Sequence, residues 1–246
     1  LTIPTENAHN GWIDGLHFNV NGARFKMVAV EGGKFVMGDP DSDSEYYKSH
    51  KVTLTGFCIG ETEVTNLLYS RITNNSGTVS NTDKAFYDLS HASSLSKITE
   101  LNKLLNTTFN LPTEAQWEFA AKGGTKSKGY VYSGSNNIDE VAWYNGNAKG
   151  IIQKVKQMKP NELGIYDMTG NVEEHVLDYY APYPLSNQID PVIKVPESTN
   201  SSKLHVVRGG TFSSSSVSCY NYSRDYLTSS ASSYDYAGFR LALNWD

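Results

Sequence analysis

Short strand-like segments and isolated helical segments follow one another irregularly along this chain, and that order limits the folds it can adopt. Residues 25–38, FKMVAVEGGKFVMG, predict a hairpin of two strands with its turn at Gly32 and Gly33. Residues 52–60, VTLTGFCIG, predict a further strand, and residues 61–73 have the apolar spacing of a helix. A doubly wound sheet would need strands and helices in regular alternation, so the order favours an α+β fold.

The strongest helix signals lie in residues 111–124, LPTEAQWEFAAKGG. Thr113 occupies the N-cap position, and Gln116 stands three residues later, where it completes a capping box. Glu114 and Glu118 lie one turn apart on this predicted helix, a spacing that acid–base catalysis can use. Because no nucleophile lies near them in the sequence, we interpret both as structural or solvent-exposed residues.

The composition limits the organisation and the partners of the chain. With 246 residues, 39% of them hydrophobic, residues 1–246 are expected to form a single domain with its own core. The formal charge of −5 argues against nucleic acid or an anionic membrane surface as a partner. No apolar run approaches the roughly 20 residues of a membrane-spanning helix. The chain starts at Leu1 without an initiating Met, which is compatible with a removed leader or anchor.

Residues 211–238 read TFSSSSVSCYNYSRDYLTSSASSYDYAG, a tract built mostly from serine and tyrosine. Disorder is one interpretation, since serine-rich segments bury little apolar surface. The flanking segments VVRGGTF and GFRLALNW look like core, however, and the tract carries five tyrosines. A core strand is a second interpretation, but such a strand would hold far fewer hydroxyl groups.

A recognition surface is the third interpretation, and it accounts for every residue type in the tract. Tyrosine offers a large contact area at low entropic cost, while serine, asparagine and glycine offer adaptable polar contacts, as in antibody binding loops. We therefore predict that the tract binds a ligand.

Motifs along most of the chain resemble, in the same order, those of the formylglycine-generating enzymes, also called sulfatase-modifying factors. These motifs are FVMG (35–38), ETEVTN (61–66), LPTEAQWEFAAKGG (111–124), PNELGIYDMTGNVEE (160–174), VVRGGTF (206–212) and GFRLA (238–242). The resemblance implies the C-type-lectin-like fold of that family, with much irregular structure.

The active members of the family are copper-dependent oxidases that use two thiolates near the carboxyl end. Counted from Gly209 and Gly210, the second of these cysteines falls on Cys219, but the first falls on Ser214. A neutral serine hydroxyl cannot replace a thiolate as a ligand of the soft cuprous ion. We therefore predict that the chain is not an enzyme.

The resemblance also implies one structural calcium ion and requires no other cofactor. Its ligands would be Asp167, Gly170, Val172 and Glu174, which offer the hard oxygen donors that calcium takes. The alternative is that Gly170 and Asn171 only form a turn while the two acids face water.

The carboxyl-terminal region is similar to that of one subgroup of the family, the variable proteins diversified by retroelements. In that subgroup the changes are targeted to adenines, so asparagine codons yield Ser, Tyr, Asp, Asn and Ala. The resemblance implies a variable ligand-binding region over about residues 208–240. The changeable contact positions that it implies are Ser213, Ser214, Ser215, Ser218, Tyr220, Asn221, Tyr222, Asp225, Tyr226, Tyr234, Asp235 and Tyr236. The fixed positions that would hold the tract to the core are Val217, Cys219, Leu227 and Ala231.

Three arginines flank or interrupt the tract. Arg208, Arg224 and Arg240 could contact a ligand, but we expect at least two of them to brace the tract through hydrogen bonds to backbone carbonyls.

These patterns together predict a non-enzymatic protein that displays a hypervariable, Ser- and Tyr-rich binding surface on a rigid scaffold. Its expected partner is a protein or another macromolecule. The resemblance implies display at the cell surface, with anchoring through a removed N-terminal segment. A copper-dependent oxidase and a calcium-dependent carbohydrate-binding module are the alternatives.

Overall fold

The computed structural model describes residues 12–13, 16–73, 77–184, 186–194, 204–228 and 236–244, and within these ranges the strands form three sheets. The five-stranded sheet has the order β1 (Trp12–Ile13), β2 (His17–Val20), β3 (Ala23–Val30), β6 (Phe57–Gly60) and β12 (Ala242–Asn244). The four-stranded sheet has the order β10 (Arg224–Thr228), β9 (Leu204–Arg208), β7 (Glu173–Tyr179) and β11 (Ala237–Gly238). The three-stranded sheet has the order β4 (Gly33–Met37), β5 (His50–Leu54) and β8 (Gln188–Ile189).

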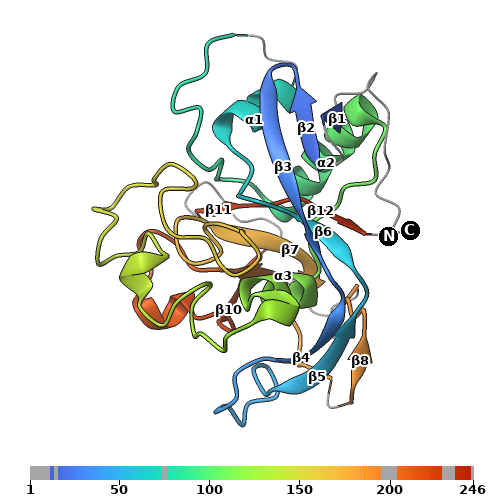
Figure 1. Cartoon of the computed structure of the whole chain (residues 1–246), viewed down its shortest axis with the longest axis vertical. Coiled ribbons are helices and arrows are strands. Elements are labelled where there is room, and N and C mark those ends of the chain that lie inside the picture. Colours follow the sequence, from blue (N-terminus) through green and yellow to red (C-terminus); the bar gives the residue numbers. More distant parts are fainter. Residues whose placement is uncertain are drawn as a thin grey trace.

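The α-helices of the described ranges are α1 (Asn66–Ile72), α2 (His91–Leu105) and α3 (Glu114–Ala121). Figure 1 shows α1 and α2 beside β2 and β3 at one end of the molecule, β4, β5 and β8 at the opposite end, and α3 and β7 between them. Short 3₁₀ helices are η1 (Gly124–Lys126), η2 (Ile138–Glu140) and, inside the tract, η3 (Ser216–Cys219). None of the helices in the described ranges is both long and apolar enough to span a bilayer. The mixture of helices, separate sheets and irregular chain confirms the predicted α+β class.

The hairpin predicted over residues 25–38 is wrong, because its two strands belong to different sheets. β3 pairs with β2 and β6, whereas β4 pairs with β5. The chain crosses between the sheets at Gly32, where an added Cβ would lie 2.5 Å from the carbonyl oxygen of Leu54. This glycine therefore permits a close backbone approach instead of closing a two-residue turn. The strand predicted over residues 52–60 is likewise divided into β5 and β6, at residues 55–56.

Helix α3 carries the caps that the sequence predicts. The Thr113 hydroxyl accepts a hydrogen bond from the Gln116 N–H at 3.1 Å, and the Gln116 side chain accepts one from the Thr113 N–H at 2.9 Å. Every residue of the helix is buried, since α3 lies against β4, β5, β7 and β9. Glu114 and Glu118 are therefore structural residues and not solvent-exposed ones.

Two apolar clusters build most of the core. One surrounds Trp117 of α3, and the other lies between α1, α2 and the five-stranded sheet. Cys58 belongs to the second cluster, where it packs as a small buried hydrophobe, and burial raises the pKa of its thiol to about 11. Val206, before the tract, and Phe239, after it, lie in these clusters. Core packing therefore fixes both flanks of the tract.

Candidate ligand-binding site

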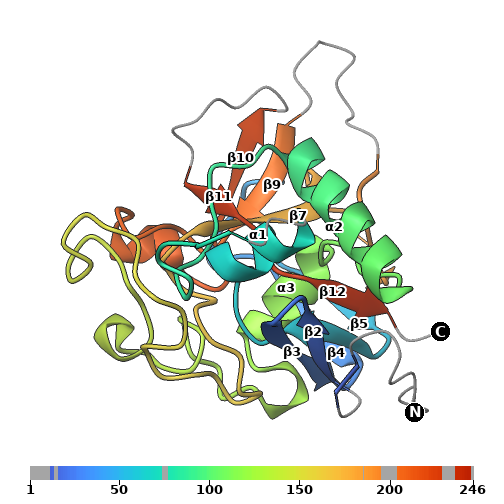
Figure 2. The ribbon, with the colours of Figure 1, turned by 90° about the horizontal axis from the view of Figure 1, so that it is seen from above.

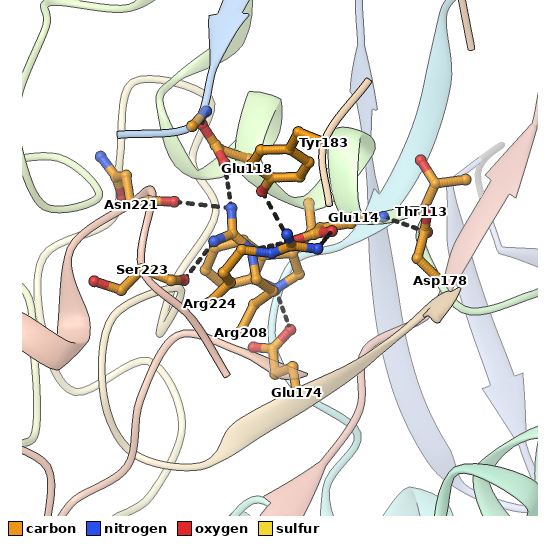
Figure 3. Close-up of polar contacts among 12 residues, drawn as sticks. Thr113, Glu114, Glu118, Glu174, Asp178, Tyr183, Arg208, Asn221, Ser223 and Arg224 are labelled. Atoms are coloured by element: carbon orange, nitrogen blue, oxygen red, sulfur yellow. Dashed lines mark hydrogen bonds and ion pairs between the residues drawn. The ribbon is translucent and has the colours of Figure 1, made fainter. Parts of the chain in front are cut away.

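Two glutamates of α3 pair with two arginines of the four-stranded sheet beneath the tract (Figure 3). Arg224, the first residue of β10, donates to both carboxylate oxygens of Glu114, at 2.8 and 2.7 Å. Arg208, the last residue of β9, pairs with Glu118 and also lies 3.6 Å from Glu114. All four side chains are buried. These four residues form an ion-pair layer. The two-pronged pair of Arg224 with Glu114 fixes both distance and orientation, so the layer positions the start and the middle of the tract.

The opposite charges in this layer stabilise each other in their ionised forms, although the side chains are buried. Burial by itself would raise the pKa of Glu118, but Lys122 and Arg208 outweigh it and hold that pKa below its usual value. Burial would likewise lower the pKa of Arg224, but Glu114 outweighs it and holds that pKa above its usual value. Both residues are therefore charged at neutral pH.

Arg208 also ties the tract to this ion-pair layer. Its guanidinium donates hydrogen bonds to the backbone carbonyl of Asn221, at 3.2 Å, and to that of Ser223. Its Cζ atom lies 5.2 Å from the centre of the Trp117 ring, so the cation also rests on an aromatic face. Arg208 thus braces the tract in the way that the sequence analysis expected.

The other two arginines do not brace the tract in that way. Arg224 donates to the carbonyl of Ala181 at 3.0 Å, and Arg240 donates to that of Gly60 at 3.0 Å, both outside the tract. The expectation of at least two arginines on tract carbonyls is therefore wrong, since among the described residues Arg208 alone does this. All three are buried, so direct ligand contact through them is not supported.

A pocket of about 490 Å³ lies between the tract and the segment that joins β4 to β5. Its tract wall includes Ser214, Ser218, Tyr220 and Tyr222, and its other wall includes Asp39 and Tyr47. Figure 2 shows the tract around η3 beside the irregular loops of residues 122–172. Backbone hydrogen bonds from Asn145 to Ser214 and from Asn221 to Val131 join the two. These bonds hold the tract against the loops, while the pocket itself is lined by the tract, by the end of β9 and by the segment between β4 and β5.

Most predicted contact positions in the described ranges present their side chains to solvent. Those that are exposed are Ser213, Ser215, Ser218, Asp225, Tyr226 and Tyr236, and those that are half-buried are Ser214, Tyr220 and Tyr222. Tyr234 and Asp235 lie outside the described residues, as does Ala231 of the predicted fixed positions.

Two predicted positions do not have the role assigned to them. Asn221 is 1% exposed, and its side-chain amide donates to the carbonyl of Tyr130 at 3.0 Å, so it holds the loop and cannot touch a ligand. Val217 is 56% exposed and cannot anchor the tract in the core. Cys219 is buried and packs beside Tyr132, as expected for a fixed position, while Leu227 is half-buried.

Tyrosines of the tract lie against aromatic rings from outside it. The ring centres of Tyr220 and Tyr132 are 5.3 Å apart, and those of Tyr226 and Tyr180 are 4.6 Å apart. Sequence analysis missed Tyr132, Tyr180 and the pocket residue Asp39. No local pattern could have found them, because only the folded chain decides which distant residues face the tract.

Ser214 and Cys219 approach the same point of the backbone. An added Cβ on Gly210 would lie 2.7 Å from Sγ of Cys219 and 3.4 Å from Cβ of Ser214. The fold thus brings together the two positions at which the family resemblance places paired thiolates. Burial, and then the charge of Glu173, raises the pKa of the Cys219 thiol to about 12, so it is protonated at neutral pH. A protonated thiol beside a hydroxyl does not fit the thiolate pair that cuprous copper needs.

The residues implied as calcium ligands do not fit that role as they are arranged. Arg240 donates to both carboxylate oxygens of Glu174, each at 2.6 Å, and the Trp117 indole donates to one of them at 2.8 Å. A calcium ion would have to displace a buried arginine from this carboxylate. No group of three or more His, Cys, Asp or Glu in the described ranges is arranged to hold a metal.

The alternative for this segment is also wrong in part. Gly170 and Asn171 do form a turn with positive φ angles of 74° and 62°, but Asp167 and Glu174 are buried and do not face water. Burial raises the pKa of Asp167 to about 6. Asp167 and Glu174 therefore bind groups inside the protein, the Lys156 N–H and the Arg240 guanidinium respectively.

Comparison with known proteins agrees with these observations on fold and family. The sequence profile of the sulfatase-modifying factor enzyme 1-like domain matches residues 19–94 and 85–245, and the chain belongs to this family. Chaperone protein LppX of Paenibacillus barcinonensis is 30% identical over 206 residues, which cover 63% of this chain and 72% of that protein. The formylglycine-generating enzyme of Streptomyces coelicolor is 30% identical over 154 residues, which cover 55% of this chain and 47% of the enzyme.

Among solved structures, this chain is similar to Treponema denticola variable protein 1. The TM-score is 0.80 at 26% sequence identity, and the match covers 92% of this chain and 98% of that one. The predicted family, its fold and the resemblance to a variable protein are thereby confirmed.

Proposed function

We propose that this protein is a non-enzymatic binding protein whose Ser- and Tyr-rich tract contacts a macromolecular ligand. One observation carries the proposal: in the described part of the tract, buried side chains fix the backbone, while most of the predicted contact side chains are exposed. Arg208 and Asn221 hold the loop from inside, whereas Ser213, Ser218 and Tyr226 face solvent. A surface of this kind can change its chemistry without disturbing the core.

A protein is the favoured ligand, and diversification of the tract by a retroelement is part of the proposal. Tyrosines in the centre of an interface often account for most of its binding energy. Tyr220 and Tyr222 are half-buried beside the pocket, where a ligand would cover them fully. The similarity to a variable protein supports diversification. Display at the cell surface, with anchoring through an N-terminal segment, is a further part of the proposal.

Binding can be tested with a random-peptide library displayed on phage and selected on the wild-type protein. Enriched clones should lose affinity at least about tenfold when Tyr220 and Tyr222 are replaced by Ala, while the melting temperature is retained. Tyr166→Ala is a matched control, because Tyr166 does not line the pocket. Clones that bind the double variant as well as the wild type would refute the assigned site. Diversification predicts a near-identical copy of the 3′ end of the gene next to a reverse transcriptase gene.

A copper-dependent oxidase is the second candidate, since the chain matches a formylglycine-generating enzyme and brings Ser214 next to Cys219. Copper, oxygen and a cysteine-bearing peptide should give no formylglycine with the wild-type protein. Any formylglycine product would overturn the non-enzymatic assignment. A calcium-dependent sugar site is disfavoured, because Arg240 uses both oxygens of Glu174.

A further inference from the structure

We propose that the pocket beside the tract takes a cationic side chain, lysine or arginine, from a protein ligand. This inference rests on the proposed binding function and adds the chemical class of the group that enters the pocket. It depends on three features of the lining: arginines that are already paired, carboxylates in the walls, and a pair of tyrosine rings.

The arginines in the lining are not available to an anionic ligand. Arg224 directs Nε and Nη2 to Glu114, and its Nη1 donates to the carbonyl of Ala181. Arg208 directs Nη1 and Nη2 to Glu118 and to the carbonyls of the tract. Its Nε makes no hydrogen bond but lies 3.6 Å from the Glu114 carboxylate. A carboxylate or phosphate would have to break these buried pairs, which costs more than a new surface contact returns.

The remaining charges of the lining are negative. Asp39 and Asp225 each accept one backbone N–H on Oδ1, from Asp41 and Tyr226 respectively. In the part of the chain that the structure describes, Oδ2 of these two residues makes no hydrogen bond or ion pair. A cation that enters the pocket therefore meets uncompensated negative charge.

Aromatic faces complete a site for a cation. The rings of Tyr220 and Tyr222 lie 5.2 Å apart at 41°, next to the Tyr132 ring. Ammonium and guanidinium groups bind over such rings, and more strongly where water is excluded. Burial, and then the charge of Asp39, raises the pKa of Tyr222, which keeps its hydroxyl neutral and agrees with Asp39 lying close to it.

The origin of these groups divides the pocket into a constant and a changeable part. Asp39 lies outside residues 208–240, as does Tyr132, whose ring supports that of Tyr220, whereas Tyr220, Tyr222 and Asp225 lie within them. Substitutions in the tract would then alter which ligand binds, while the constant carboxylate of Asp39 keeps the preference for a cationic group.

Two random-peptide phage libraries test this inference, one that contains all residue types and one that lacks Lys and Arg. The first library should yield the clones with the higher affinity. Replacing the Lys or Arg of these clones by Gln should weaken their binding about tenfold or more. Asp39→Asn and Asp225→Asn keep the Oδ1 acceptor and remove only charge, and each should weaken these clones. Glu100→Gln is the matched control, because its carboxylate pairs with Lys97 on α2 and does not line the pocket.

The outcomes separate this inference from the proposed function. The library without Lys and Arg could yield clones that bind equally tightly and that lose binding to the Tyr220→Ala and Tyr222→Ala variants. In that case the cationic preference is wrong and the binding site stands. Clones that Asp39→Asn and Asp225→Asn leave unchanged also overturn the preference. If neither library yields clones sensitive to the tyrosine variants, both proposals fail.

Discussion

Arg224 and Glu114 form a two-pronged ion pair between the tract and the central helix, across 110 positions of sequence. Tyr183 donates a third hydrogen bond to this carboxylate at 3.0 Å, and its ring lies 4.0 Å from the guanidinium carbon. The middle of a serine-rich segment is thereby fixed to the most buried helix of the protein. This pairing explains how residues 211–228 of the tract, which include few apolar side chains, hold a defined shape.

Removing the positive partner of this pair should destabilise the protein strongly. Arg224→Met is expected to lower the free energy of unfolding by about 3–5 kcal/mol, because Glu114 would stay buried without its main partner. Glu114→Gln should also destabilise, and the double variant should lose less than the sum of the two. Urea unfolding measures all three values. Lys97→Met removes a partly exposed pair with Glu100 on the surface of α2 and serves as the control, with an expected cost below about 1 kcal/mol. A cost for Arg224→Met as small as that of the control would contradict the anchoring role.

Neighbouring positions of the tract should differ sharply in their tolerance of substitution. Asn221→Ala should cost about 1–3 kcal/mol, because it removes a buried side chain and leaves the partly buried carbonyl of Tyr130 without its donor. Ser218→Ala and Ser218→Tyr should change stability by no more than about 0.5 kcal/mol, since Ser218 is exposed. Thermal and urea unfolding of the three variants provide the test. Equal costs at both positions would show that the tract is not divided into fixed and changeable residues.

Asp178 should make the protein less stable as pH rises toward neutrality. Burial, and then the nearby charge of Glu114, raises its pKa from 3.8 to about 7. A raised pKa gives a favourable contribution that is complete below pH 3.8 and is lost as pH rises through 7. The stability difference between wild type and Asp178→Asn should therefore shift by up to about 4 kcal/mol against the wild type over this interval.

Measuring this difference, instead of the wild-type curve alone, is necessary because buried histidines act in the opposite direction. Burial lowers the pKa of His175 to about 4, so its contribution is lost as pH falls. His175 is present in both proteins, and its effect cancels in the comparison. A difference that stays constant with pH would show that Asp178 titrates normally.

Local signals in the sequence predicted the features that depend on near neighbours. The capping box of Thr113 and Gln116 is such a feature, because both partners lie within one turn of α3. The hairpin prediction failed for the complementary reason. Strand signals at residues 25–38 are correct, but the choice of partner strand depends on β5 and β6, which follow later in the chain.

The candidate site was likewise predictable from the sequence only in part. Its outline, a Ser- and Tyr-rich tract between two core segments, follows from composition and from the apolar flanks. The different roles of Asn221, Val217 and Ser218 do not, because burial of a loop residue depends on which distant segment covers it.

The sequence by itself determined the α+β class, the capped helix α3 and the position of the Ser- and Tyr-rich tract between two core segments, since each follows from residue types and their local spacing. Only the tertiary structure decided that Glu114 and Glu118 hold Arg224 and Arg208, and that Glu174 binds Arg240. It also brought Asp39 to the pocket. The physical reason is that a buried charge needs a partner in space, and the chain supplies that partner from far away in sequence.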